Sequence, residues 1–149
     1  MNLQQASSLV EESIKGLNID PIASRKEKDG QWNITVKGAP VYLDVFNFAS
    51  KPETYYFQVM SPLFKVPESR NEEIYGDLLD MNYDMYACAI CRKNGWFYIL
   101  ALRPATGLDQ TEVNYLIDTV SHYSNDFYSK LTFKYKDVLN LNPTAGAPK

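Results

Sequence analysis

The sequence contains little of what catalysis or metal binding usually requires. Its 149 residues include one histidine, His122, and only two cysteines, Cys88 and Cys91. It has no glycine-rich phosphate loop, and no nucleophile is combined with a base in a recognisable catalytic pattern. We therefore predict a protein that is not an enzyme and that needs no cofactor.

An excess of basic residues is also missing. With 18 acidic and 15 basic residues the formal charge is −3, so the chain lacks the positive surface that binding to a phosphate backbone requires. The longest apolar run, residues 96–102, is far shorter than the roughly 18 residues of a membrane-spanning helix. The first residues lack the basic and then apolar order of a secretion signal. We expect a cytoplasmic protein that binds neither nucleic acid nor membrane.

The two cysteines are three positions apart, a spacing that some redox and zinc sites use. The apolar stretch around them, residues 86–92, predicts a strand, on which residues three apart lie on opposite faces and about 10 Å from each other, too far for a disulfide. Zinc would need two further ligands, and a redox pair would need a helix N-terminus. We interpret Cys88 and Cys91 as buried structural residues, with a metal or redox role as the alternative.

The first part of the chain predicts one helix followed by three strands. Apolar residues recur every three or four positions from Leu3 to Leu17, as in an amphipathic helix, and Asp20-Pro21 ends the pattern. Apolar and polar residues alternate over 32–36, which predicts a half-buried strand. Residues 41–48 and 55–60 also alternate, but with apolar side chains on both faces.

An antiparallel sheet with one wet face should be apolar on the other face only. We therefore expect the second face to be covered in part, by a helix or by another chain. The 11 tyrosines agree with an interface, where Tyr is enriched, although a tyrosine-rich core would explain them equally well. We name Tyr42, Phe46 and Tyr56 as a possible surface for a partner segment. That segment is expected to pair with a sheet edge and to protect the amides of 41–48 or 55–60 from hydrogen exchange.

A second helix is predicted over residues 72–85. Pro67 stops the preceding chain, and Ser69 with Glu72 matches a capping box. At 3.6 residues per turn the apolar side chains of this helix cover an arc of roughly 200°, about twice what a surface helix needs. We therefore predict a homodimer or partner interface on this helix. Its predicted residues are Ile74, Tyr75, Leu78, Leu79, Met81 and Tyr83.

One line of the same helix is entirely acidic. It consists of Glu73, Asp77, Asp80 and Asp84. Like charges at this spacing repel one another slightly, so a solvated face is the simpler interpretation. The alternative is a surface that steers a basic partner segment.

Asn94-Gly95 predicts a two-residue hairpin turn between strands 86–93 and 96–103. Asp109 and Glu112 then match a capping box, and apolar residues continue at helical spacing to Leu131. On the outer side of this last helix, His122 lies one turn from Asp118 and Asp126. These three side chains could bind a divalent metal, but a solvated polar surface is the simpler interpretation.

Periodicity does not distinguish strand from helix over residues 132–141. Residues 142–149 are rich in Pro, Gly and Ala and predict a disordered tail. We predict a single domain over residues 1–141, with the α+β element order α-β-β-β-α-β-β-α.

In this element order the chain resembles the YbjN proteins, whose domain is similar in fold to the class I type III secretion chaperones. The resemblance is most specific at Val66-Pro67 before the second helix, at Asn94-Gly95-Trp96, and at Gly107-Leu108-Asp109. It implies a twisted antiparallel sheet packed with helices and a homodimer built around the second helix. It also implies binding of an extended protein segment without ATP or metal.

Two functions therefore stay open at this point. The first is a dimeric, non-catalytic protein-interaction module with a chaperone-like or regulatory role. The second is a regulator that responds to a small ligand or metal in a pocket between sheet and helices, for which Cys88, Cys91 and His122 are the only chemical candidates.

Overall fold

The computed structural model of the protein describes residues 1–139. Its elements follow the predicted order, with one short helix in addition, and the α+β fold class is confirmed. They are α1 (Leu3–Gly16), α2 (Pro21–Ser24), β1 (Gln31–Val36), β2 (Ala39–Phe48), β3 (Lys51–Lys65), α3 (Asn71–Asp84), β4 (Ala89–Lys93), β5 (Trp96–Pro104) and α4 (Gln110–Lys134). The additional helix is α2, which begins where the Asp20 carboxylate accepts a hydrogen bond from the Ile22 amide at 2.9 Å.

The strands form one antiparallel sheet in the order β1-β2-β3-β5-β4. The predicted hairpin turn joins β4 to β5, because Asn94 and Gly95 have φ angles of 50° and 76°, the positive values that a type I′ turn requires. β4 begins at Ala89 and is shorter than predicted. The reason is Ala87, whose φ of 60° interrupts the extended backbone.

β3 is longer than predicted and continues to Lys65. Pro62 is unfavourable inside an interior strand because it has no amide hydrogen to donate to a neighbouring strand. The pairing with β5 accommodates it by a register shift between Pro62 and Phe64. The extra residues carry buried side chains, among them Leu63 and Phe64.

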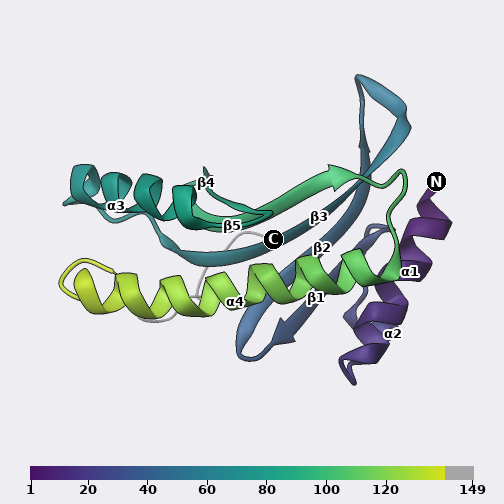
Figure 1. Ribbon diagram of the computed structural model, residues 1–149, viewed down its shortest axis with the longest axis horizontal. Coiled ribbons are helices and arrows are strands. Elements are labelled where there is room, and N and C mark those ends of the chain that lie inside the picture. The colour runs from purple at the N-terminus through teal and green to yellow at the C-terminus, as the bar shows by residue number, and fades with distance from the viewer. Residues whose placement is uncertain (140–149) are drawn as a thin grey trace.

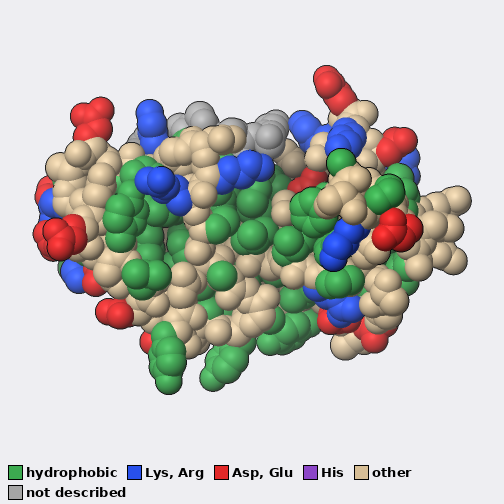
Figure 2. All heavy atoms as spheres, turned by 90° about the horizontal axis from the view of Figure 1, so that it is seen from above, with side chains coloured by type: hydrophobic (Ala, Val, Ile, Leu, Met, Phe, Trp, Pro, Cys, Tyr) green, Lys and Arg blue, Asp and Glu red, His purple; other side chains and the backbone are tan. Residues whose placement is uncertain are grey.

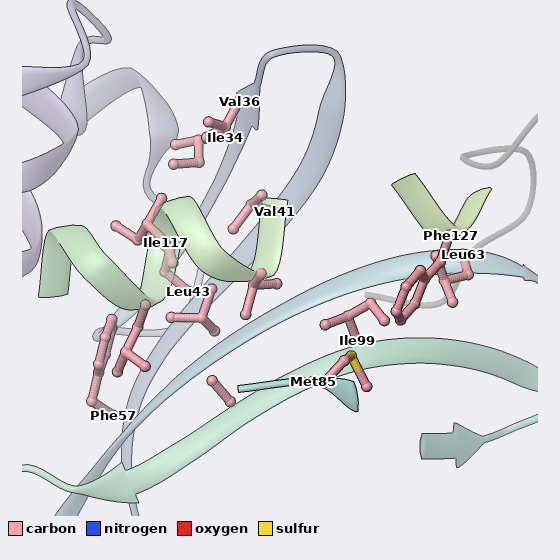
Figure 3. Packing of buried hydrophobic residues seen from close by; sticks show 14 of the residues in the cluster. Ile34, Val36, Val41, Leu43, Phe57, Leu63, Met85, Ile99, Ile117 and Phe127 are labelled. Atoms are coloured by element: carbon pink, nitrogen blue, oxygen red, sulfur yellow. The ribbon is translucent and has the colours of Figure 1, made fainter. Parts of the chain in front are cut away.

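The core lies between one face of the sheet and α4, which runs along that face (Figure 1). α1 packs beside α4 at one end of the molecule, and α3 lies beside β4 at the other end. In Figure 3, Val41 and Leu43 of β2 meet Ile117 of α4, while Leu63 and Phe127 gather farther along. These apolar side chains supply most of the favourable free energy of folding.

A buried polar contact joins β3 to α4 within this core. The Ser61 hydroxyl donates to the Pro40 carbonyl at 2.6 Å, so the Ser124 hydroxyl is left to donate to Ser61 at 2.7 Å. Both serines are buried, and buried hydroxyls are costly without partners. This contact fixes the position of α4 across the sheet.

Helix capping follows the sequence at α4 but not at α3. The Asp109 carboxylate accepts a hydrogen bond from the Glu112 amide at 2.8 Å, as predicted. The predicted capping box of Ser69 and Glu72 does not form. α3 begins at Asn71, and its N-cap residue is Arg70, which has a left-handed backbone conformation and no side-chain cap hydrogen bond. The Arg70 guanidinium instead forms ion pairs with Glu73 at 3.2 Å and with Asp137 at 2.7 Å.

After Leu131 the chain continues as helix rather than strand. α4 extends to Lys134, and Tyr135 is fully buried behind it. Lys134 pairs with Asp77 at 2.7 Å, and the Tyr135 hydroxyl donates to the same carboxylate, which ties the end of α4 to α3. The predicted tail, 142–149, lies outside the described residues. Within residues 1–139, no helix is long and apolar enough to cross a membrane.

Candidate protein-binding surfaces

The sheet face turned away from α4, here called the open face, carries aromatic side chains. Along β2, Val41 and Leu43 point to the core, so Tyr42 and Phe46 point to the open face. Tyr56 pairs with Phe46 across the strands and shares this face. Figure 2 looks onto this side and shows hydrophobic side chains gathered over its middle, with Lys and Arg side chains beside them.

The structure brings two of the three predicted partner-binding residues into one cluster. Phe46, Phe48 and Tyr56 form an aromatic patch, with ring centroids of Phe48 and Tyr56 4.9 Å apart and those of Phe46 and Phe48 5.1 Å apart. Tyr42 lies farther along the same face, paired with Met60. Phe48 alternates with Phe46 and is 41% exposed, and it joins this patch although the predicted surface does not include it.

A hollow of about 530 Å³ lies on the open face between the aromatic patch and the loop before β1. Asp44 is half-buried in it, and its two carboxylate oxygens accept hydrogen bonds from the side-chain amides of Gln31 at 2.6 Å and Gln58 at 3.2 Å. Burial raises the pKa of the Asp44 carboxyl, more than these amides and nearby lysines lower it. Lys26, Lys28 and Lys93 also line the hollow.

A second apolar surface lies where α3 meets β4. Leu79 is 70% exposed and Tyr83 is 89% exposed, and Tyr86, which follows α3, is exposed as well. We call these three residues the α3 edge. A shallow hollow of about 370 Å³, lined by Tyr75 and Leu79 among others, separates α3 from β4.

The predicted α3 interface is divided between core and surface. Ile74 and Leu78 are buried in the core of the single chain, whereas Tyr75 and Met81 are half-buried. An arc of roughly 200° is wide enough to face the core on one side and solvent on the other. Only the outer part of the arc, at Leu79 and Tyr83, is therefore available to another molecule.

Two of the four carboxylates in the acidic line on α3 form ion pairs. Glu73 pairs with Arg70 and Asp77 pairs with Lys134. The hydrogen bond from Lys134, and after it the one from the Tyr135 hydroxyl, lower the pKa of the Asp77 carboxyl. Within residues 1–139, Asp80 and Asp84 are exposed and have no ion-pair partner.

Cys88 and Cys91 lie on opposite sides, as predicted. Cys88 packs against the main core and Cys91 against the cluster of Met60, Trp96 and Tyr98 on the open face. Both thiols are half-buried rather than buried, because β4 lies at the edge of the sheet. Burial raises the pKa of both thiols, that of Cys88 to about 11.

The side chains around His122 are engaged elsewhere. His122 is exposed and its ring contacts Tyr123 edge to face, with centroids 5.6 Å apart. Asp118 pairs with Lys37 at 3.2 Å, and Asp126 pairs with Lys130 at 2.8 Å. Among the described residues, no three His, Cys, Asp or Glu side chains are grouped so that they could hold a metal ion.

The Cys88 thiol is expected to react slowly in the folded protein. A pKa of about 11 instead of 9.0 lowers its thiolate fraction near neutral pH by about 100-fold, and only the thiolate is nucleophilic. We would measure alkylation by iodoacetamide at pH 7.5 in the Cys91→Ser variant, and use the same variant unfolded in urea as the control. Equal rates in the two states would contradict the burial of this thiol.

Comparison with known proteins gives a structural likeness only. No protein-family model matches the chain, and no curated protein matches it in sequence. The type III secretion chaperone SycH of Yersinia pestis, solved with a stable fragment of YscM2, superimposes with a TM-score of 0.57 and 14% identity over 81% of this chain and 98% of that chain. A chain of the HopA1–SchA chaperone–effector complex gives a TM-score of 0.60 and 10% identity, covering 87% of this chain and 98% of that one.

A chain of the ExsC–ExsE complex gives a TM-score of 0.62 at 10% identity, over 85% of this chain and 92% of that chain. At such low identity the likeness concerns architecture, and the five-stranded antiparallel sheet packed with helices is what these proteins share. The chain has the fold of the type III secretion chaperones.

Proposed function

We propose that this protein is a non-catalytic, chaperone-like module that binds a segment of a partner protein on its open face and works as a homodimer. The observation that carries the proposal is the aromatic patch of Phe46, Phe48 and Tyr56, which lies on the sheet face turned away from α4. Phe48 is exposed and the other two rings are half-buried, and clustered aromatic side chains that reach the surface are typical of protein-binding sites.

The fold supports this proposal. SycH was solved with a fragment of a second protein, and SchA was solved in a chaperone–effector complex. The short motifs at Val66-Pro67 and Asn94-Gly95-Trp96 further support a relationship to the YbjN proteins. Binding of this kind needs surface complementarity and no cofactor.

The proposed dimer uses the α3 edge. Leu79, Tyr83 and Tyr86 form an apolar surface beside the short edge strand β4. A second copy placed on this surface would bury these side chains and leave the aromatic patch, on β2 and β3, available to the partner segment. Two functions would then occupy two separate surfaces.

The mode of partner binding differs from the sequence-based expectation. Most of β2 and β3 is paired on both sides, so over that length their main chains cannot accept another strand. Their hairpin ends, residues 46–48 and 51–54, are paired with each other but have no strand on the other side. Only β1 and β4 lie at the edges of the sheet that the structure describes. We therefore propose that the segment is held mainly by side-chain contacts on the open face, and that hydrogen-exchange protection appears at β1 or in the loop before it.

A photoreactive benzoylphenylalanine at position 48 is expected to form covalent adducts with a partner protein in the native cell, because Phe48 is exposed on the open face. The matched control is the same amino acid at position 115, since Tyr115 is 51% exposed on α4. The captured protein should bind the purified chain and should bind a Phe46→Ser, Tyr56→Ser variant at least 10-fold more weakly. Equal adducts at both positions, or a tightly bound small molecule without any protein, would contradict the proposal.

A further inference from the structure

The hollow on the open face is positively charged although the chain is acidic overall. Lys26 and Lys28, from the segment before β1, and Lys93, from the end of β4, all line it and are exposed. Within residues 1–139 none of the three has an ion-pair partner. The formal charge of the whole chain is −3, so the positive charge of this hollow does not reflect the overall composition.

The one acidic side chain among the described residues of this hollow offsets only part of the charge of the three lysines. The Asp44 carboxylate is half-buried, and each of its oxygens already accepts a hydrogen bond from a glutamine amide. The side chains of the three lysines, in contrast, donate no hydrogen bond to any side chain or carbonyl in the part of the chain that the structure describes, so their donors are available to another molecule. The floor between them is apolar and aromatic, with Phe46, Phe48 and Met60.

We infer that this hollow receives a partner segment that is both acidic and apolar. Its aromatic or aliphatic side chains contact the aromatic patch and Met60, and its carboxylates lie against Lys26, Lys28 and Lys93. The inference rests on the proposed function and specifies the chemistry of the partner. It differs from the alternative interpretation of the acidic line on α3, a surface that steers a basic segment. That line belongs to another element, and two of its four carboxylates are already paired.

Lysines beside aromatic rings also suit single-stranded nucleic acid. Protein is favoured here because three lysines on an acidic chain make a small footprint for a phosphate backbone. Chains of the same fold were solved with protein partners.

The test begins with a phage-displayed library of random peptides selected on the purified full-length chain. Enriched peptides are expected to combine Asp or Glu with aromatic or aliphatic residues. The enrichment of acidic residues should disappear for a Lys26→Glu, Lys28→Glu, Lys93→Glu variant. A control variant with Lys37, Lys130 and Lys136 changed to Glu carries the same change in net charge on the side of the sheet that α4 covers, and it should keep the enrichment.

Kinetics of the strongest peptide provide the second measurement. Its association rate constant should fall about 10-fold in the Lys26, Lys28, Lys93 variant at low salt, and the difference should shrink at high salt because rim charges act on encounter. Asp44→Asn removes a negative charge and should accelerate association roughly 2- to 3-fold. An acceleration cannot arise from unfolding, so the two variants together exclude that explanation.

The outcomes separate the inference from the proposed function. Enrichment of basic or uncharged peptides, or equal rates in the two lysine variants, would overturn the inference while partner binding on the open face stands. Failure to enrich any peptide would overturn the proposed function and the inference with it. Displacement of the peptide by a single-stranded oligonucleotide would assign the hollow to nucleic acid and overturn the inference.

Discussion

Changing both Leu79 and Tyr83 to aspartate is expected to convert a dimer into a folded monomer. These side chains are 70% and 89% exposed in the single chain, so their replacement removes little packing from the core. In a dimer built on the α3 edge, the same change places charges in a dry contact, which costs several kcal/mol of association. The dissociation constant should therefore rise by about 100-fold or more.

Light scattering in line with a sizing column, at tens of micromolar, would measure the change. The matched control is Tyr115→Asp with Phe133→Asp, because both residues are exposed on α4. Leu78→Asp is not a suitable test, since Leu78 is buried in the core and its change would unfold the chain. A monomeric wild-type protein, or a dimer that tolerates both aspartates on α3, would refute the α3-edge dimer.

Gly30→Ala is expected to destabilise the fold by about 3 kcal/mol, a large part of the roughly 5–15 kcal/mol that stabilises a typical domain. Gly30 has a φ of +79°, which costs other residues about 1–2 kcal/mol. An added Cβ would also lie 2.5 Å from the Val45 carbonyl oxygen, and the chain cannot easily move away because the Val45 amide donates to the Gly30 carbonyl at 2.7 Å.

Gly95→Ala separates these two causes. Gly95 has nearly the same φ, +76°, but an added Cβ would meet nothing within 4 Å. This variant should therefore lose only about 1 kcal/mol, for the backbone conformation alone. Urea unfolding followed by circular dichroism gives both values, and equal losses would show that close contact at Gly30 contributes nothing.

The sequence predicted those elements whose boundaries depend on local chemistry. Asn94-Gly95 and Asp109 act within a few residues of themselves, so the hairpin turn and the start of α4 followed directly. The predictions failed where distant contacts decide. Pro62 is tolerated in β3 because the strand beside it shifts register. Ser69 does not cap α3, whose N-cap residue is Arg70, a side chain that pairs with the distant Asp137.

For the candidate surfaces too, the sequence predicted the features that depend on local pattern and missed those that depend on distant contacts. Strand alternation was enough to place Tyr42, Phe46 and Tyr56 on one face. The sequence gives no sign of the lysines of the hollow, because Lys28 and Lys93 are far apart in sequence and belong to opposite edges of the sheet, beside β1 and on β4. The arc on α3 was recognised, but periodicity alone could not divide it between the core and the surface.

One side chain on α3 has a consequence for self-assembly. The Asn82 amide accepts from the Ile90 main-chain nitrogen at 2.6 Å and donates to the Ile90 carbonyl at 3.4 Å, at the outer edge of β4. A foreign strand would have to displace Asn82 before it could extend the sheet there. The protein can thus expose aromatic side chains for specific recognition while its β4 edge resists the strand-by-strand growth that leads to fibres.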